Sequence, residues 1–512
     1  MKLGDLIKGL PIELIRGEGG AEVDEIVYDS RKAGPGALFA ALPGANVAGA
    51  GGHMYIRDAY DRGCRMFLVQ DMPEGAMSGA GDFAELRTQD TRRALALMSR
   101  RFFGYPERRL KVVAVTGTKG KTTISYMLRS IFEAAGKKVA LIGSNGVIYE
   151  GFYKKLLNTT PESYLIHGFL KEMADAGIEY CFIEATSQGF KLHRTEGIEF
   201  DAALFTNISP DHISDTEHKD FNQYLECKKR VFDQTRTCYV NRDAEFFDDI
   251  VADTPEGLVR AFGFSREDGG RARDGDGFPL NYTARDVRPV RDDGRLTVEF
   301  LCAAPGWQLD MKVGMPGFFN VENALGAICI ADHFGIGQGA IAQGLATVSC
   351  EGRMEFVDVP APYLVLIDFA HNSLSMKALI DTARSYNPNR LLFVFGLEGE
   401  RTAVRNADCG EALGREADYI ILSDASPRTA DPEWILSDIA AGIERGGGAG
   451  KYEIIRDRHV SIPKILDMAE PGDLVILLGK GNVLYEEVHG ELTPMDEREI
   501  IRDYFAALDG GS

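Results

Sequence analysis

Residues 111–123 (KVVAVTGTKGKTT) constrain what this 512-residue chain can fold into more than any other segment. Residues 112–115 are entirely apolar and rich in β-branched side chains, which predicts a buried strand. A turn that contains Gly117 and Gly120 follows, and residues 124–135 then show helical spacing as far as Gly136. The order of strand, glycine-rich turn and helix is the one that a phosphate-binding loop requires.

Glycines in this turn would let backbone N–H groups approach phosphate oxygens, and the helix N-terminus would add partial positive charge. We expect Lys121 to reach the terminal phosphates of a nucleotide and the Thr122 hydroxyl to bind Mg²⁺. A standard loop has four residues between its glycines, whereas two residues separate Gly117 from Gly120. A glycine turn with a solvated lysine is the alternative, and the flanking strand and helix favour the phosphate loop.

Alternation of apolar strands with helices continues along the chain and predicts an α/β protein with a parallel, doubly wound sheet. We divide the chain into three α/β domains, residues 1–107, 108–350 and 351–512. Residues 265–294 are rich in Gly, Asp and Arg, which predicts an exposed excursion. The further expected strands are residues 180–185, 202–207, 364–369, 391–395, 419–422 and 474–478, with an antiparallel pair at 296–301 and 309–313.

Composition excludes several classes of function. The 77 acidic residues outnumber the 57 Lys and Arg residues and give a net charge of −20, which argues against a nucleic-acid or anionic-membrane partner. The N-terminal sequence is too polar for a signal peptide, and no apolar run reaches the length of a membrane span. The eight cysteines form no CxxC pair, which indicates reduced thiols. We therefore expect a cytoplasmic protein with no membrane insertion.

Acidic and histidine side chains follow the predicted strands. Glu184 ends one strand, and Asp211 and His212 come shortly after the next. Ligands of open α/β sheets bind beyond the carboxyl ends of the strands, where carboxylates can hold Mg²⁺ and His212 could be a less usual nitrogen ligand. Each of these residues alone would more often make a local hydrogen bond, and their convergence with the phosphate loop favours a metal site. Asp368 and His371 fit two interpretations equally well: a turn or helix cap, and a role at the ligand site.

An ordered series of motifs covers nearly the whole chain. They are YDSR (28–31), PGALFAALPG (35–44), TGTKGKTT (116–123), NTTPES (158–163), EATSQGFKLHR (184–194), TNISPDH (206–212), CKKRVF (227–232), GFFNVEN (317–323), GRME (352–355), DFAHN (368–372) and LGKGNVLYEE (478–487). Together they resemble the Mur ligase family, and within it the UDP-N-acetylmuramoyl-tripeptide synthetases (MurE). The resemblance implies a three-domain architecture: a UDP-MurNAc-binding domain, a central ATP domain and a Rossmann-like C-terminal domain that binds the amino acid.

The resemblance also implies a reaction in peptidoglycan precursor synthesis. ATP would phosphorylate the D-glutamate side-chain carboxylate of UDP-MurNAc-L-Ala-D-Glu, and the amine of an incoming amino acid would displace phosphate. Physical chemistry agrees, because a carboxylate is a poor acyl donor and two clustered anions need Mg²⁺ and lysines to approach each other.

Site residues follow from the resemblance by position. ATP would be held by Thr116, Gly117, Thr118, Lys119, Gly120, Lys121, Thr122, Asn320, Arg353 and Asp368. Mg²⁺ would be held by Thr122, Glu184, His212 and Lys228, the last as a carbamate, and the catalytic group would be Lys121, Lys228, His371 and Arg353. The substrates would be bound by Ser30, Asn158, Thr159, Thr160, Thr186, Arg194, Arg401, Ser426, Arg428, Gly479 and Val483. From the residues alone, Lys228 would be one more basic residue on an exposed helix.

The incoming amino acid is the point at which the chain departs from its family. Relatives that add meso-diaminopimelate carry DNPR and the glutamate of GKGHE, whereas this chain has ASPR at 425–428 and Val483. The site for a distal zwitterion needs an anion for the ammonium and donors for the carboxylate, so the lost glutamate weakens that specificity. Residues 187–194, 209–224 and 367–380 resemble the lysine-adding branch, and Asp424 and Asp431 could meet a lysine ammonium. We therefore predict L-lysine, with ornithine and diaminopimelate as alternatives.

Other functions remain open at this point. A folylpolyglutamate or cyanophycin synthetase would share the ligase chemistry, and a small-molecule kinase or GTPase would share only the ATP site. A scaffold without activity is the non-enzyme alternative, which Lys121, Glu184, His212 and Lys228 argue against. We further expect a monomer whose domains close on binding.

Overall fold

The computed structural model describes residues 1–44, 51–210, 213, 217–255, 257–264, 279–292, 295–399 and 403–509. The chain forms two compact units, one of Met1–Thr283 with Gly326–Ile341 and the other of Ala284–Leu325 with Ala342–Ser512. The expected division into three domains remains a prediction. No helix of the described residues is both long and apolar enough to cross a bilayer, and all eight cysteines are buried free thiols.

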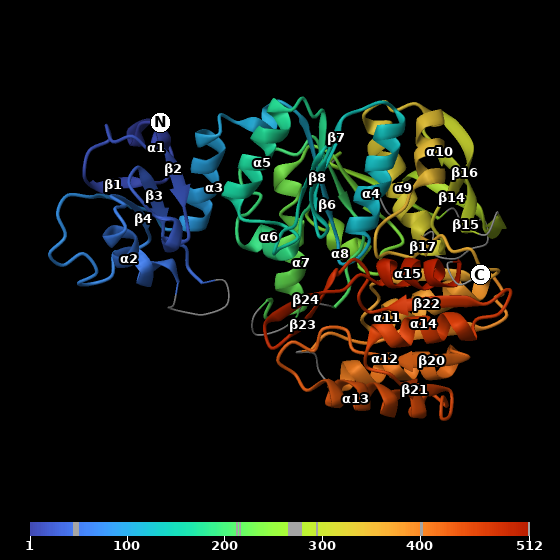
Figure 1. Ribbon diagram of the computed structural model, residues 1–512. Coiled ribbons are helices and arrows are strands. Elements are labelled where there is room, and N and C mark those ends of the chain that lie inside the picture. Colours follow the sequence, from blue (N-terminus) through green and yellow to red (C-terminus); the bar gives the residue numbers. More distant parts are fainter. Residues whose placement is uncertain are drawn as a thin grey trace. The chain divides into compact units, whose positions relative to one another are not determined.

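The first sheet of unit 1 has the order β1-β5-β4-β3-β2, with β2 to β5 parallel and β1 antiparallel to β5 (Figure 1). Helix α3 begins after Asp90, whose carboxylate accepts hydrogen bonds from the N–H groups of Arg92 and Arg93. The elements are α1 Leu3–Ile7, β1 Glu13–Arg16, β2 Glu25–Val27, η1 Ser30–Lys32, β3 Ala37–Ala40, η2 Gly52–Tyr55, α2 Ile56–Asp61, β4 Met66–Val69, β5 Ala84–Arg87, α3 Thr91–Phe102 and η3 Pro106–Arg108.

The central sheet of unit 1 carries the predicted phosphate loop. Strands β13, β12, β11, β6, β10 and β7 are parallel in that order, which places the carboxyl ends of β6, β10 and β11 at one edge. The elements are β6 Lys111–Thr116, α4 Lys121–Ala134, β7 Val139–Gly143, β8 Gly146–Tyr149, β9 Phe152–Lys154, α5 Ser163–Asp175, β10 Tyr180–Glu184, α6 Ser187–Lys191, β11 Ala202–Phe205, α7 Phe221–Lys229, η4 Phe232–Gln234, β12 Cys238–Asn241, α8 Phe247–Val251 and β13 Val259–Phe264.

Helices cover both faces of this parallel sheet, as the doubly wound prediction requires. On one face, Ile166 and Leu170 of α5 pack in one cluster with Ala114 and Ile183. On the other face, the Phe132 ring of α4 contacts that of Phe182, with their centroids 5.1 Å apart. A purely parallel sheet is nevertheless wrong, because β8 and β9 add to one edge as an antiparallel meander.

The expected excursion at residues 265–294 is also wrong in part. Residues 265–278 lie outside the described residues, whereas β14 (Leu280–Asp292) is a long strand that extends the sheet beyond β13. The predicted antiparallel pair is confirmed as β15 (Arg295–Ala304) and β16 (Trp307–Val313). Helices α9 (Phe318–His333) and α10 (Gln338–Thr347) follow these strands.

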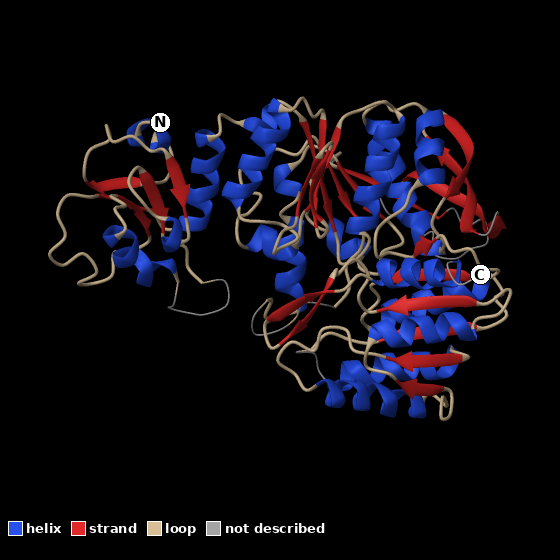
Figure 2. Cartoon of the chain, in the orientation of Figure 1, coloured by secondary structure: helices blue, strands red, loops and turns tan. Residues whose placement is uncertain are grey.

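The C-terminal sheet of unit 2 has the order β17-β18-β22-β19-β20-β21, parallel except for β17 (Figure 2). Successive residues of each strand point to opposite faces of the sheet and so enter two different cores. Phe393 and Ile476 pack with α11, α12 and α13, while Val394 and Val475 pack with α14 and α15. The elements are β17 Glu355–Val357, β18 Leu364–Asp368, α11 Ser373–Ser385, β19 Leu391–Phe395, α12 Ala403–Glu416, β20 Tyr419–Leu422, α13 Pro432–Arg445, β21 Tyr452–Ile454, α14 Arg458–Met468, β22 Leu474–Leu478, β23 Tyr485–Val488, β24 Glu491–Pro494 and α15 Glu497–Asp509. The predicted α/β class is confirmed.

Candidate active site

The loop between β6 and α4 is shaped by its backbone. Gly117 has φ 143°, and a Cβ there would lie 1.9 Å from the Thr206 hydroxyl, so no side chain fits. Gly120 has φ 88° and is the N-cap of α4. The Lys119 N–H donates to the Asn207 side-chain oxygen at 3.0 Å, and the Thr206 hydroxyl donates to the Lys119 carbonyl at 2.6 Å. Residues 206–207 after β11 therefore brace the loop, as expected for strand ends at one sheet edge.

Two lysine side chains converge on this loop. The Lys121 ammonium donates to the Gly117 and Thr118 carbonyls at 2.8 and 3.0 Å. The Lys228 ammonium, on α7 and only 2% exposed, donates to the Gly117 carbonyl at 2.8 Å. Lys228 is thus not the exposed helix residue that spacing alone suggests. Two buried or half-buried ammonium groups beside a glycine loop form a site that suits a polyphosphate.

A carboxylate and three hydroxyl groups lie next to the loop. Glu184, the last residue of β10 and 2% exposed, accepts a hydrogen bond from the Thr122 hydroxyl at 2.9 Å. The same carboxylate accepts from the backbone N–H of Ser144 at 3.1 Å and from its hydroxyl at 3.0 Å. The Ser144 hydroxyl also contacts the Thr159 hydroxyl at 3.0 Å. Ser144 was missed by the sequence analysis, although its place directly after β7, at the shared sheet edge, is the signal that could have found it.

This oxygen-rich set fits Mg²⁺, a hard cation that prefers oxygen ligands. Thr122 and Glu184 would supply a hydroxyl and a carboxylate oxygen, with Ser144 holding the carboxylate in place. His212 and Arg401 lie outside the described residues, so their predicted roles are not tested. Within the described ranges, no group of three or more His, Cys, Asp and Glu side chains is arranged to hold a metal.

The predicted substrate residues of unit 1 form a connected network around Thr160. Its hydroxyl donates to the Glu184 carbonyl at 2.8 Å and accepts from the Thr186 N–H at 3.0 Å. Arg194 donates to the Thr160 carbonyl at 3.0 Å and to the Glu162 carboxylate at 2.9 Å. Thr160 therefore connects Glu184, at the end of β10, and Arg194 in one hydrogen-bond network.

Tyr28 of the YDSR segment interacts electrostatically with Glu162. Burial, together with the Glu162 carboxylate, raises the pKa of Tyr28 to about 12. Arg92 of α3 also pairs with Glu162, at 3.1 Å, and is a further residue that the sequence analysis missed. Ser30 is buried at the start of η1, and Asn158 is exposed.

The predicted phosphate-contacting residues of unit 2 cluster after β18. The Asp368 carboxylate accepts from the Met354 N–H at 2.8 Å and the Ala370 N–H at 2.7 Å, so it shapes a turn, as one of the two expectations had it. The Arg353 guanidinium lies 4.8 Å from the centre of the Phe369 ring. His371 donates through Nδ1 to the Phe369 carbonyl at 2.9 Å.

Asn320 is fully buried in α9. Its amide donates to the Pro316 carbonyl at 2.7 Å and accepts from Asn323 at 2.9 Å. These contacts fix the side chain within unit 2, and its role toward ATP remains a prediction.

The loops after β20 and β22 carry the residues predicted to select the amino acid. Arg428 has φ 55° and pairs with Glu398 at 3.2 Å and with Glu487 at 3.5 Å. A Cβ at Gly479 would lie 1.9 Å from the Gly396 carbonyl, so the loops after β22 and β19 touch through their backbones. Ser426 is buried, and its hydroxyl accepts from the Glu487 N–H at 3.3 Å.

Two further residues, Val483 and Glu486, lie after β22. Val483 is half-buried. Glu486 is half-buried too, and burial raises the pKa of its carboxyl above the usual range. This edge of the sheet is therefore rich in carboxylates, which suits a ligand that carries an ammonium group.

Two parts of the chain match models of one protein family. Residues 115–331 match the Mur ligase middle domain, and residues 352–481 match the Mur ligase, glutamate ligase domain. These segments contain the phosphate loop, the loops after β18, β19 and β20, and the start of the loop after β22.

Curated relatives align along nearly the whole chain. The UDP-N-acetylmuramoyl-L-alanyl-D-glutamate--2,6-diaminopimelate ligase of Clostridium perfringens is 32% identical over 509 residues, which are 98% of this chain and 99% of the relative. The ligase of the same name from Clostridium tetani is 31% identical over 513 residues, which are 99% of this chain and 100% of the relative.

Solved structures share the fold. A ligase of that name has a TM-score of 0.67 at 22% identity and covers 99% of both chains. Folylpolyglutamate synthase of Mycobacterium tuberculosis has a TM-score of 0.59 at 18% identity and covers 76% of this chain and 92% of its own.

Phosphate loop, fold and relatives agree on the class of protein, an α/β ligase that uses ATP. The chain belongs to the Mur ligase family, as its motifs predicted, and the two relatives named above are UDP-N-acetylmuramoyl-L-alanyl-D-glutamate--2,6-diaminopimelate ligases.

Proposed function

We propose that this chain is an ATP-dependent amide ligase that joins L-lysine to the D-glutamate side-chain carboxylate of UDP-MurNAc-L-Ala-D-Glu. The observation that carries the proposal is the convergence of Lys121 and Lys228 on the Gly117 carbonyl, beside the Thr122–Glu184 pair. Lys121 offers positive charge, and the Thr122–Glu184 pair, together with Lys228 as a carbamate, offers metal-binding oxygens at one loop, which the transfer of a phosphoryl group between two anions requires.

The proposed reaction has two steps. A carboxylate oxygen of D-glutamate attacks the γ-phosphorus of ATP, the bond to ADP breaks, and an acyl phosphate forms. The amine of the incoming amino acid then attacks the acyl carbon, phosphate leaves with the bonding electrons, and the nitrogen loses a proton. The peptide substrate would contact Thr160, Thr186 and Arg194, which form one hydrogen-bond network with Glu184.

Lys228 has a distinct proposed role. Its burial and its position beside the loop support a carbamate, because such a group would turn a buried cation into a pair of anionic oxygens suited to Mg²⁺. Activity of the Lys228→Ala variant restored by added carboxylic acids would support this role, and unchanged activity of the variant without them would contradict it.

The choice of L-lysine rests on the charges after β19, β20 and β22. Arg428 pairs with both Glu398 and Glu487, so its charge is already compensated within the protein. Glu486 adds a further carboxylate, whereas Asp424 is paired with Arg456 at 3.0 Å. An acceptor with a distal ammonium and no distal carboxylate suits this balance. The second candidate is diaminopimelate, which the names of the relatives and the retained Arg428 favour.

The test is phosphate release with ATP, Mg²⁺ and UDP-MurNAc-L-Ala-D-Glu, using L-lysine, L-ornithine and diaminopimelate as separate acceptors. We expect release with L-lysine at least about tenfold faster than with the others. Faster release with diaminopimelate would support the proposed reaction and show that diaminopimelate, not L-lysine, is the acceptor. No release with any acceptor, or release only with a folate and glutamate, would contradict the proposed function.

We also propose that the enzyme acts as a cytoplasmic monomer, which the acidic composition and the buried free thiols support. Light scattering on the purified protein should give the mass of one chain, 56.1 kDa. A mass of two chains or more would contradict the monomer.

A further inference from the structure

A lysine that the proposed function does not use lies inside unit 2, directly after β22. Lys480 is 2% exposed, and its ammonium donates to the Ala425 carbonyl at 2.8 Å, to the Tyr485 carbonyl at 2.6 Å and to the Ser426 hydroxyl at 3.5 Å. An ammonium has three protons to donate, so these three acceptors use its full capacity. No described carboxylate lies within 4.0 Å of it, so its direct partners are two backbone carbonyls and one hydroxyl.

These acceptors belong to two different segments. Ala425 and Ser426 lie after β20, in the segment 425–428 that ends with Arg428. Tyr485 begins β23, after the segment 479–483 that contains Val483. A single buried ammonium therefore joins the two segments proposed to meet the incoming amino acid.

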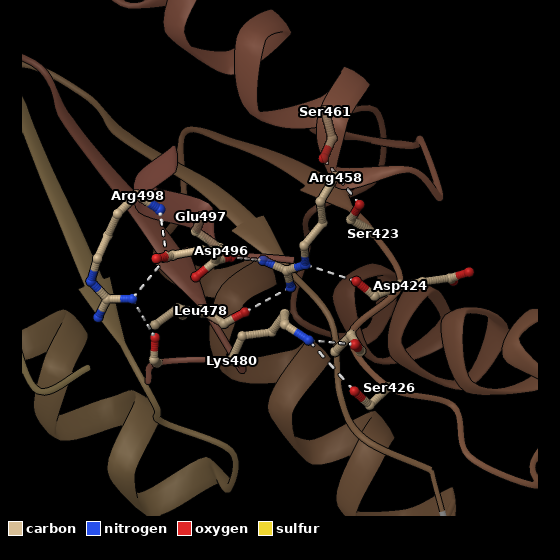
Figure 3. A network of polar contacts seen from close by, with 12 residues as sticks. Ser423, Asp424, Ser426, Arg458, Ser461, Leu478, Lys480, Asp496, Glu497 and Arg498 are labelled. Atoms are coloured by element: carbon tan, nitrogen blue, oxygen red, sulfur yellow. Dashed lines mark hydrogen bonds and ion pairs between the residues drawn. The ribbon is translucent and has the colours of Figure 1, made fainter. Parts of the chain in front are cut away.

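A second buried cation, Arg458, also connects the residues after β20 to the end of β22 (Figure 3). Arg458, the first residue of α14 and 3% exposed, donates to the Asp424 carbonyl at 2.7 Å and to the Leu478 carbonyl at 3.0 Å. Its remaining guanidinium nitrogen pairs with the buried Glu497 at the start of α15. Arg458 thus connects Asp424, the residue before Ala425, to Leu478, which lies two residues before Lys480.

We infer that Lys480 is a positioning residue that sets the distance between segments 425–428 and 479–483, and so determines how tightly the incoming amino acid is bound. The inference rests on the proposed function, because it assumes that these segments receive the amino acid. An uncharged side chain of similar length would leave the Ala425 and Tyr485 carbonyls without their donor, and the two segments would separate.

The test is the Lys480→Met variant, with Michaelis constants measured for all three substrates. We expect the KM for the amino acid to rise about ten- to a hundredfold, while the KM values for ATP and the UDP-linked substrate stay unchanged. The matched control is Lys451→Met, which removes an ammonium that donates to the Ala417 carbonyl at 3.3 Å, at the opposite ends of β20 and β21. The control should change none of the three constants.

A readout besides activity separates the inference from the proposed function. The Arg428 N–H donates to the Glu487 carbonyl and the His489 N–H to the Arg428 carbonyl, so these amides report how well the segment after β20 is held. Hydrogen exchange at both amides should be faster in Lys480→Met than in the parent and unchanged in Lys451→Met. The milder Ser426→Ala variant removes one of the three acceptors and should shift KM and exchange in the same direction by a fewfold.

Each outcome decides one point. If Lys480→Met has a lower kcat and melting temperature but an unchanged KM for the amino acid, the inference is overturned. Lys480 would then stabilise the fold without setting the affinity for the amino acid. Unchanged exchange at Arg428 and His489 in both Lys480→Met and Ser426→Ala would also overturn it. If the parent turns over no amino acid, the proposed function fails, while faster exchange in the variants would still support Lys480 as the residue that holds the two segments together.

Discussion

The phosphate loop of unit 1 and the loops after β20 and β22 in unit 2 occupy the same kind of place, beyond the carboxyl ends of parallel strands. They differ in how far charged side chains hold their backbone. In the phosphate loop, Gly117 leaves no room for a side chain and residues 206–207 brace the backbone through neutral groups, while the Lys121 and Lys228 ammonium groups donate to its carbonyls. The loops of unit 2 are shaped by buried charged side chains, namely Lys480 and Arg458 with its partner Glu497. Ionisation should therefore matter for the shape of the second region and much less for the first.

The largest expected effect concerns the phosphate loop. Lys121→Met should lower kcat for ATP-dependent ligation at least about a thousandfold, because the lysine beside the loop compensates the charge of the transferring phosphate. The melting temperature should change little, since Gly117 and residues 206–207 maintain the shape of the loop. The control is Lys137→Met, which removes an exposed lysine at the other end of α4 and should leave kcat unchanged. A loss below about tenfold in Lys121→Met would contradict the assigned role.

Next in size is the effect of breaking the buried ion pair of unit 2. Arg458→Met leaves the Glu497 carboxylate buried without its partner, and it should lower the free energy of unfolding by about 3–5 kcal/mol. The double variant Arg458→Met/Glu497→Leu should recover much of that loss, because two apolar side chains remove the uncompensated charge. Denaturant unfolding checks both. Equal stability of the single variant and the parent would contradict the comparison between the two regions.

Backbone shape can be tested at the phosphate loop with two glycines at opposite ends of α4. Gly117→Ala would place a methyl group against the Thr206 hydroxyl and should weaken ATP binding about a hundredfold. Gly136→Ala is the matched control: Gly136 also has positive φ, 72°, but open space around it, so only backbone strain of about 1 kcal/mol is expected. Calorimetric titration with a non-hydrolysable ATP analogue measures the difference. Similar affinities for the two variants would show that the close contact at Gly117 does not shape the site.

The same contrast explains what the sequence could predict. The strand, loop and helix around Gly117 lie within residues 111–123, so a local pattern predicted them. The contact of Lys228 with the Gly117 carbonyl joins residues 111 positions apart, and only family resemblance pointed to it. Lys480, Arg458 and Glu497 are dispersed along the chain and look like ordinary surface charges, because sequence spacing does not distinguish a buried charge from a solvated one. Strand β14 was missed because the polar, glycine-rich stretch before it masked its start.

A smaller effect is expected at Ser144, the residue of the Glu184 cluster that the sequence analysis missed. Ser144→Ala removes a hydroxyl that donates to the Glu184 carboxylate, so the carboxylate is held less firmly toward Thr122. The Mg²⁺ concentration for half-maximal activity should rise about tenfold. Ser99→Ala, which removes a buried hydroxyl that donates to the Leu95 carbonyl within α3, should leave the Mg²⁺ dependence unchanged. An unchanged dependence in Ser144→Ala would remove Ser144 from the proposed metal site.

The smallest effect is a pH dependence that should distinguish the two regions directly. Burial, together with the charge of Arg458, lowers the pKa of Lys480 from 10.5 to about 8, although Glu497, Glu486 and Glu398 act in the opposite direction. Below pH 8 the folded protein therefore carries the full cost of a buried charged lysine. Between about pH 8 and 10.5 the unfolded chain binds more protons at this position than the folded chain, so this cost falls as pH rises.

From pH 7 to 9 the parent should accordingly gain about 1 kcal/mol in the free energy of unfolding relative to Lys480→Met. Subtracting the variant removes the titration of the groups that do not interact with Lys480, and the coupled carboxyls Glu486 and Glu497 are compared in parallel Glu486→Gln and Glu497→Gln backgrounds. Lys451→Met, whose lysine lies away from the buried junction, should follow the parent across the same range. A difference between parent and Lys480→Met that stays constant from pH 7 to 9 would mean that the Lys480 ammonium is not electrostatically destabilised in the fold. The stability of the loops after β20 and β22 would then depend on ionisation no more than that of the phosphate loop.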